Sequence, residues 1–327
     1  MTRHASHKNC APGRVLEFYL CSVNTVNRMK YSKTPLTFAE QISSLKKRGL
    51  FVADENKALH YLSNISFYRL RAFTYPFQDN QNPSHPFIKK VSFEEVIALY
   101  VFDRRLRLLI FNALEKIEIS LRTKIIYHYS HEFGNQFYEN QELFRNCERF
   151  RTDHQKLLVE MKRSSEDFIR HYYKKYTTPQ HPPAWMSLEV ASMGWLSQFY
   201  KNLKRSDTKR KIALDIGLPK EDFLENWMHV FTNLRNNCAH HSRIWNRRFV
   251  VEPMLPKNTT YQFITNRRIH TNKLYAALCC IQYINNQISP ESSFRKYLLQ
   301  LMNSCPMNQQ IEMGFPENWL TEKLWNE

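Results

Sequence analysis

The stretch "SFEEVIALYVFDRRLRLLIFNALEKIEISLRTKI", residues 92–125, decides the fold class. Ser92 and Glu95 have the spacing of a capping box, in which two residues satisfy each other's free backbone N–H groups, so a helix is expected to begin here. Apolar residues then recur at intervals of three and four, which predicts one long helix buried along one face. They are Leu99, Phe102, Leu106, Leu109, Ala113, Ile117, Leu121 and Ile125. Two charged pairs, worth a few tenths of a kcal/mol each, are expected on the flanks: Asp103 with Arg107, and Glu118 with Arg122.

Further helical signals lie on both sides of this stretch. Thr37 and Glu40 form a second capping box, and Gly49 is expected to end the helix that it opens. The segment "YTTPQHPPAWMS" has three prolines within five residues, which predicts a loop, and an apolar helix is expected to resume at Ala184 and to run through Leu196 to Tyr200. More helices are predicted over residues 220–241, 272–288 and 294–302.

Alternating β patterns are scarce, and the strongest of them, "FVVEPML" at residues 249–255, is short. The predicted fold class is therefore all-α. Met29 stands just before the first helical signal, whereas residues 1–28 lack a clear periodicity. We expect residues 1–28 to be an N-terminal extension without stable structure, or an upstream reading of the start site, and residues 29–327 to be a single all-α domain.

The charge of the chain indicates a polyanionic partner. Forty-seven Lys and Arg against thirty Asp and Glu give a formal charge of +17, which RNA, DNA or an anionic membrane would complement. A membrane is disfavoured, because no apolar run approaches the roughly 20 residues that span a bilayer. The early segment "VLEFYLCSV" is too short and contains Glu17, so no signal peptide is expected.

Cysteine and glycine usage excludes several other classes of protein. The seven cysteines are an odd number without a C-x-x-C pair, which favours a reducing cytoplasm and argues against both a disulfide framework and a structural zinc site. The chain has only six glycines and no phosphate-binding glycine motif, so nucleotide cofactors are not expected.

The segment "NLRNNCAHHSRIWNRRF", residues 233–249, carries the candidate chemistry. On a helical wheel of residues 224–241 one stripe forms a core face: Leu224, Trp227, Phe231, Leu234 and Cys238. Asn236 and His240 are one turn apart and lie opposite that stripe, whereas Arg235 and His241 lie at its borders. We expect His240 to face water or a partner, and His241 to be a packing histidine at the core border.

Taken alone, His240 is best explained as an ordinary surface histidine. Its neighbours change this interpretation, because basic residues interleaved with an aromatic ring suit an RNA strand: they are Arg243, Trp245, Arg247 and Arg248. The clusters "FYRLRAF", with Arg69 and Arg71, and "FDRRLR", with Arg104, Arg105 and Arg107, are further candidates for an RNA groove. Salt bridges on the flanks of buried helices would explain these two clusters equally well.

The same residues suit RNA cleavage without a metal ion. No carboxylate or His/Cys cluster with ligand spacing accompanies Cys238, His240 and His241. A neutral imidazole at His240 could take the proton of the RNA 2′-hydroxyl, and Arg235 could stabilise the charge that develops on the phosphorus. Asn236 would hold the imidazole or a phosphate oxygen.

One copy of this motif is expected to be incomplete. Arg235 and His240 project about 140° apart on an ideal helix, at 100° per residue. Pairing two such helices about a two-fold axis would place both His240 side chains in one cleft, flanked by both Arg235 residues. The sequence therefore predicts a homodimer with a composite site.

With these residues identified, the sequence resembles the Abi-like family of abortive-infection proteins (AbiD and AbiF). The R-N-x-x-x-H signature of the HEPN superfamily of ribonucleases corresponds to Arg235, Asn236 and His240. Further similar segments include "KALHYLSNISFYRLRAFTYPF" and "PPAWMSLEVASMGWLSQFYKNL", and the resemblance extends over residues 30–327. It implies a HEPN-type helical bundle with additional helices, RNA as substrate, and a toxin-like role in defence against phage.

Two functional hypotheses follow. The first is a metal-independent endoribonuclease that cuts RNA by 2′-hydroxyl attack and leaves 2′,3′-cyclic phosphate ends. The second is a non-catalytic RNA-binding module of a toxin–antitoxin or defence system, since the resemblance includes relatives that work with a small non-coding RNA and HEPN-like folds also serve as binding modules. Binding alone would depend on the arginines and hardly on His240.

Overall fold

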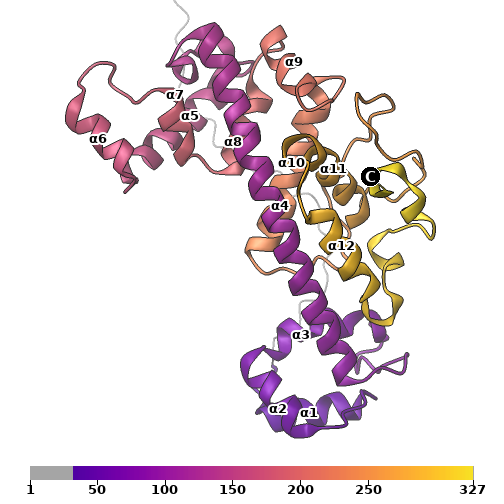
Figure 1. Ribbon diagram of the computed structural model, residues 1–327. Helices are drawn as coiled ribbons and strands as arrows, with labels where there is room; N and C mark the ends of the chain where they lie inside the picture. The colour runs from indigo at the N-terminus through magenta and orange to yellow at the C-terminus, as the bar shows by residue number, and fades with distance from the viewer. Residues whose placement is uncertain (1–31, 327) are drawn as a thin grey trace, which may run out of the picture.

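The computed structural model describes residues 32–326 and is built along one long helix. This helix, α4, extends over Phe93–Phe133 and has 41 residues, and it crosses the molecule from one end to the other (Figure 1). The capping box predicted at its start is confirmed: the Ser92 hydroxyl accepts from the Glu95 N–H, and the Glu95 carboxylate accepts from the Ser92 N–H at 2.7 Å. The predicted apolar stripe is buried, except that Leu109 is only partly so.

The described part of the chain is all-α, as predicted, and contains no strand. The segment 249–255 is irregular, and the expectation for residues 1–28 lies outside the described residues. The other α-helices are α1 (Phe38–Lys47), α2 (Glu55–Asn64), α3 (Phe67–Thr74), α5 (Cys147–Arg163), α6 (Asp167–Lys175), α7 (Ala184–Ser187), α8 (Met193–Asn202), α9 (Asp207–Leu214), α10 (Glu221–Ala239), α11 (Leu274–Ile288), α12 (Phe294–Asn303) and α13 (Lys323–Asn326).

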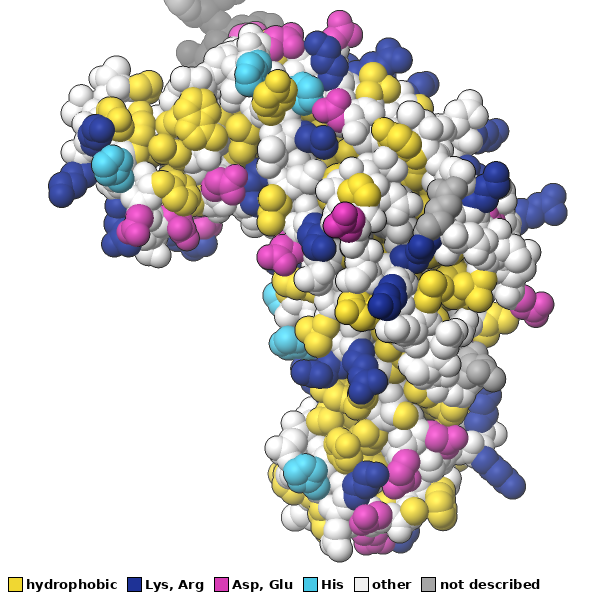
Figure 2. All heavy atoms as spheres, viewed as in Figure 1, with side chains coloured by type: hydrophobic (Ala, Val, Ile, Leu, Met, Phe, Trp, Pro, Cys, Tyr) yellow, Lys and Arg dark blue, Asp and Glu magenta, His cyan; other side chains and the backbone are white. Residues whose placement is uncertain are grey.

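The other helices are distributed along α4 in three groups (Figure 1). Helices α1 to α3 surround its N-terminal end, and α10 to α12 pack beside its middle. Helices α5 to α9 lie toward its C-terminal end, with α6 farthest from the axis. The outline of the molecule is concave between the first and third groups (Figure 2). Buried apolar residues from Ile42 to Trp325 form one continuous cluster, so α4 joins all three groups through a shared core.

The two charged pairs of α4 lie deeper than expected. Asp103 is fully buried and Arg107 is 6% exposed, so this pair belongs to the core and not to a solvated flank. Arg122 is also buried, and it donates both to Glu118 and to the backbone carbonyl of Ala191. Both predicted i,i+4 pairs are therefore confirmed, but they are more buried than pairs on a solvated flank because α4 is covered by helices on several sides. Removing one partner of such a pair leaves a buried charge uncompensated.

The helix expected from Ala184 to Tyr200 is interrupted. Helix α7 ends at Ser187, a 3₁₀ turn follows over Leu188–Val190, and α8 begins at Met193. Ser192 ends the irregular stretch, because its hydroxyl accepts from the Trp195 N–H and caps the new helix. The first helix behaves as predicted, with the Thr37–Glu40 capping box at its start and Gly49, at φ +99°, just beyond its end.

A buried lysine ties α9 to its neighbours. Lys209 has no exposed surface, and its ammonium group donates to the Leu203 carbonyl at 2.8 Å and to Glu225 on α10 at 2.6 Å. It also lies 5.0 Å from the ring centroid of Tyr200. Burial lowers the pKa of Lys209 to about 8, and the Glu225 carboxylate only partly opposes this.

This pKa gives the stability a defined dependence on pH. Between about pH 8 and 10.5 the unfolded chain retains the Lys209 proton that the folded protein has released, so stability rises with pH in this window. We expect wild type to gain free energy of unfolding relative to Lys209→Met as the pH is raised from 7.5 to 9.5. Denaturant titrations at a series of pH values measure this, and parallel curves for the two proteins would contradict it.

Candidate functional site

Helix α10 positions the candidate residues. Its first turn carries Glu221 and Asp222, which suit the positive end of the helix dipole. The predicted core stripe is confirmed, since all five of its residues are buried: Leu224, Trp227, Phe231, Leu234 and Cys238. The helix ends at Ala239, and His240 is its C-terminal cap, with its N–H donating to the Asn236 carbonyl at 2.9 Å.

The three residues of the motif have different surroundings. Asn236 and His240 are exposed, as the helical wheel predicts, and no hydrogen bond within residues 32–326 engages either side chain. Arg235 is half-buried, and its guanidinium lies 5.5 Å from the ring centroid of Phe111 on α4. The site therefore presents an uncommitted imidazole and amide to solvent, with the guanidinium turned toward α4.

His241 does not lie at the core border. Its side chain is exposed and its backbone has φ 55°, because the helix has already ended and the wheel no longer applies. The predicted packing role is therefore wrong. Its carbonyl oxygen accepts a hydrogen bond of 2.9 Å from Nη1 of Arg69 on α3, so the residue after His240 is attached to α3.

A buried carboxylate holds the segment that follows the motif. Oδ1 of Asp103 accepts from the backbone N–H of Ile244 at 2.9 Å and of Trp245 at 2.7 Å, and Oδ2 accepts from Nε of Arg107 at 3.0 Å. Burial raises the pKa of Asp103, and the two N–H groups and Arg107 act in the opposite direction. The loop after His240 is thus attached to α4 as well as to α3.

Trp245 was predicted to contact RNA, but it belongs to the core. Its indole is fully buried and stacks on Phe73 at 6.2 Å and on Phe77 at 6.4 Å between ring centroids. Arg243 is largely enclosed as well, because it donates to the Ala72 carbonyl and covers the Trp245 ring at 5.7 Å. Burial lowers the pKa of Arg243. Trp245 and Arg243 thus hold the loop against α3 and the core, and little of either side chain is accessible to a ligand.

The other predicted RNA contacts divide into three groups. Arg71 and Arg247 are half-buried, and they lie within hydrogen-bond distance of His85 (3.2 Å) and of the Arg243 carbonyl (3.3 Å), respectively. Arg107 is buried in its ion pair with Asp103, so its predicted contact with RNA is wrong. Four predicted contacts are exposed to solvent and could be reached by a phosphate backbone: Arg69, Arg104, Arg105 and Arg248.

Arg235 lines a pocket of about 790 Å³ between α4, α5 and α8. The other basic side chains of this pocket have acidic partners within 3.5 Å: Arg122, Arg149, Lys156 and Arg163. Arg235 takes part in no ion pair of the described residues, and Asn236 and His240 do not line the pocket. One copy of the chain therefore does not gather Arg235 and His240 in this pocket.

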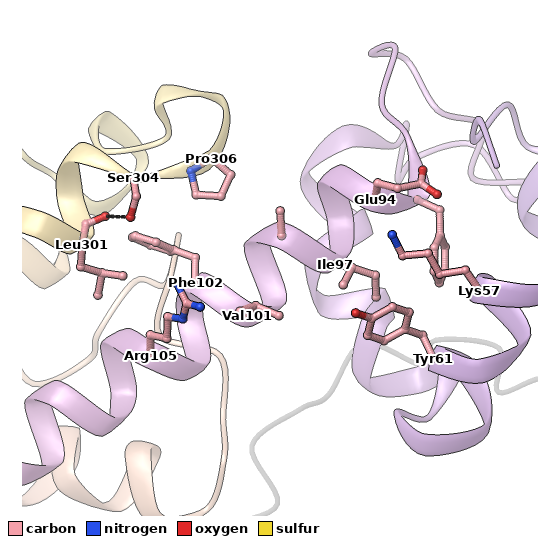
Figure 3. A pocket seen from close by; sticks show the side chains of 12 residues that line it. Lys57, Tyr61, Glu94, Ile97, Val101, Phe102, Arg105, Leu301, Ser304 and Pro306 are labelled. Carbon is pink, nitrogen blue, oxygen red and sulfur yellow. Dashed lines mark hydrogen bonds between the residues drawn. The ribbon is translucent and has the colours of Figure 1, made fainter. Parts of the chain in front are cut away.

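A separate, mainly apolar pocket of about 330 Å³ lies between α2, α4 and the segment after α12. Ile97, Val101 and Phe102 form its floor, and Lys57 and Arg105 stand toward its opposite ends (Figure 3). None of the three motif residues lines it.

Other chemistry near the motif is limited. Burial raises the pKa of Cys238 to about 12, so this thiol is protonated at neutral pH and is a poor nucleophile. In residues 32–326 no group of three or more His, Cys, Asp or Glu residues has a geometry that could hold a metal ion. None of the described helices has the length and apolar character that crossing a membrane requires.

This arrangement defines an all-α protein whose central helix supports a polar helix end bearing a histidine. The family model described as "Abi-like protein" matches residues 60–246, which is more than half of the 327-residue chain. The chain therefore belongs to the Abi-like protein family. No curated protein and no solved structure matches it.

Removing the carboxylate of Asp103 should destabilise the protein, because this group holds the loop that follows His240. In Asp103→Ala, Arg107 loses its buried partner and two backbone N–H groups lose their acceptor, so we expect a loss of about 3–5 kcal/mol in the free energy of unfolding. Asp79→Ala is a matched control, because Asp79 also accepts from two backbone N–H groups, of Gln81 and Asn82, but in an exposed turn where water can replace it. Equal losses in the two variants, measured by urea unfolding, would contradict the assigned role.

Proposed function

We propose that this protein is a metal-independent endoribonuclease that acts as an effector of abortive infection against phage. The observation that carries the proposal is the end of α10, where Asn236 and His240 are exposed and where, among residues 32–326, Arg235 has no ion-pair partner. Membership of the Abi-like family supports the defensive role. The order Arg235, Asn236 and His240 also follows the R-N-x-x-x-H signature of HEPN ribonucleases, which supports RNA as the substrate.

The proposed reaction needs only side-chain chemistry. The neutral imidazole of His240 removes the proton of a 2′-hydroxyl, and the resulting oxygen attacks the adjacent phosphorus. The bond from phosphorus to the 5′-oxygen breaks, and that oxygen takes up a proton as it leaves. The products are a 2′,3′-cyclic phosphate and a free 5′-hydroxyl. Arg235 stabilises the charge on the phosphorane oxygens, and Asn236 holds the imidazole or a phosphate oxygen.

A second copy of the chain completes the site in this proposal. The outer side of α10 carries a stripe of polar residues without fixed charge at intervals of four, three and four, of which Asn233 is half-buried and the other three are exposed: His229, Asn233, Asn236 and His240. On a chain of charge +17, a stripe without fixed charges lets two copies approach without strong repulsion. Two-fold pairing along this stripe brings two His240 residues together with two Arg235 residues.

His240→Ala tests catalysis. Expression of wild type in a bacterial host should arrest growth and yield RNA with 2′,3′-cyclic phosphate ends, and His240→Ala should abolish both effects, because the general base is lost. Sequencing of RNA ends and growth curves provide the two measurements. His241→Ala is the matched control, since this neighbouring histidine is exposed and lies outside the motif.

The competing hypothesis gives a different result in the same experiment. A non-catalytic RNA-binding or non-coding-RNA-associated module would retain its effect in His240→Ala and lose it when exposed arginines are replaced. Equal toxicity of wild type and His240→Ala would therefore refute the nuclease. Cleavage by the purified protein should persist in excess EDTA, and its loss there would refute the metal-independent mechanism.

The composite site requires a dimer. Sedimentation at the assay concentration should show a homodimer for wild type and a monomer with little activity for Asn233→Arg, because two guanidinium groups would then face each other across the two-fold axis. Gln300→Arg on α12 adds the same charge at an exposed position away from the stripe and should remain dimeric and active. A wild-type protein that is fully active as a monomer would exclude the composite site.

A further inference from the structure

Two adjoining pockets lie at the C-terminal end of α4, away from the motif. The first, of about 490 Å³, is lined by the last turns of α4, including Tyr127 and His131. The second, of about 350 Å³, lies between α6 and α7 and includes Tyr176. Asn135 and Trp185 line both pockets. The two pockets therefore adjoin each other at Trp185, and together we call them the aromatic groove.

The rings of this groove face solvent. Tyr127 is 57% exposed, Trp185 is 46% exposed and Tyr176 is 45% exposed, although aromatic rings of this size are usually buried. Figure 2 shows hydrophobic side chains gathered over α6 and α7, with Lys and Arg at the outer rim. Asn135, between the two pockets, is exposed as well. Flat apolar faces beside an amide side chain suit stacked bases more than an aliphatic partner.

The charges around the groove favour a polyanion. Helix α6 carries Arg170, Lys174 and Lys175 against a single acidic residue, Asp167, and all four are exposed. The Lys175 ammonium lies 5.3 Å from the ring centroid of Tyr176, so cation and ring are presented together. The acidic residue that lines the groove, Glu189, has Arg122 as a partner at 3.5 Å.

The aromatic groove adjoins the pocket of Arg235. Glu189 lines both the Tyr127 side of the groove and the 790 Å³ pocket that contains Arg235. Along α4, the lining residues run from Glu118 to His131, which is about 20 Å at 1.5 Å per residue. Three neighbouring pockets, each sharing lining residues with the next, thus lie between the half-buried guanidinium of the motif and the exposed rings near α6.

We propose that the aromatic groove is a binding site for a single-stranded segment of RNA, which continues along α4 toward Arg235. Bases stack on Trp185 and Tyr127, and the phosphates lie near Lys174 and Lys175. The groove selects single strands, because the faces of bases in a duplex are already stacked on one another. This inference rests on the proposed function, since it assigns the position and the strandedness of the substrate.

Equilibrium binding to a fluorescein-labelled single-stranded oligouridine tests the proposal, with the matching duplex as comparison and all variants made in the His240→Ala protein to prevent cleavage. Loss of one stacked base corresponds to roughly a 5- to 150-fold weaker affinity, so Trp185→Leu should raise the Kd for the single strand by this factor. Trp185→Phe keeps a ring and should restore most of the affinity. Tyr297→Leu, at a 53% exposed ring on α12, should bind like the parent.

The outcomes separate this inference from the proposed function. If the His240→Ala parent binds the single strand and Trp185→Leu binds it equally well, the aromatic groove is not an RNA site. Its exposed rings would then be explained by the binding of a protein partner. If the parent binds no RNA at all, both the groove and RNA as substrate are refuted. Equal affinity of the parent for single strand and duplex would also overturn the proposal. Thermal melting of each variant confirms that the compared proteins are folded.

Discussion

The buried carboxylate of Asp103 is the interaction on which the site depends. It lies on the central helix, far in sequence from the motif, and accepts the backbone N–H groups of Ile244 and Trp245 immediately after α10. Arg107 compensates its charge from one turn further along α4. The loop also buries its Trp245 indole in the core. The end of α10 is therefore held in place on both sides of the loop. The imidazole of His240 is thus presented from a firmly held helix end, which suits the proposed role of a general base.

Most of the arginines near the motif serve the fold. Arg107 and Arg243 compensate or cover buried groups, whereas Arg69 combines both roles, since it holds the His241 carbonyl and remains exposed. The large positive charge of the chain therefore overstates the number of side chains that a phosphate backbone could meet near His240. The exposed cations of α6 lie in a different part of the molecule, which is why the aromatic groove extends the candidate RNA surface well beyond the motif.

The sequence was sufficient to predict the elements of structure that depend on residues close together in the chain. The capping boxes at Thr37 and Ser92 and the stripe on α10 depend only on neighbours within a few residues, and the structure confirms them. His241 and Trp245 were misassigned because their positions depend on where the helix ends and on Asp103, which is more than 130 residues away. Helix α5 was not predicted, although Asn146 at its start and the buried Phe150, Leu157 and Met161 were available signals. The aromatic groove was missed because its rings come from separate segments that only the fold brings together.

The length of α4 has one more consequence. A continuous helix of 41 residues is about 60 Å long, and it passes beneath both the end of α10 and the aromatic groove. Because the helix has no internal break, the spacing between these two regions is a fixed property of the chain. A strand bound at one region would arrive at the other after a constant number of nucleotides. Under the proposed function, the length of α4 would then set the distance between the bound segment and the place of cutting, whatever the bases at the cut.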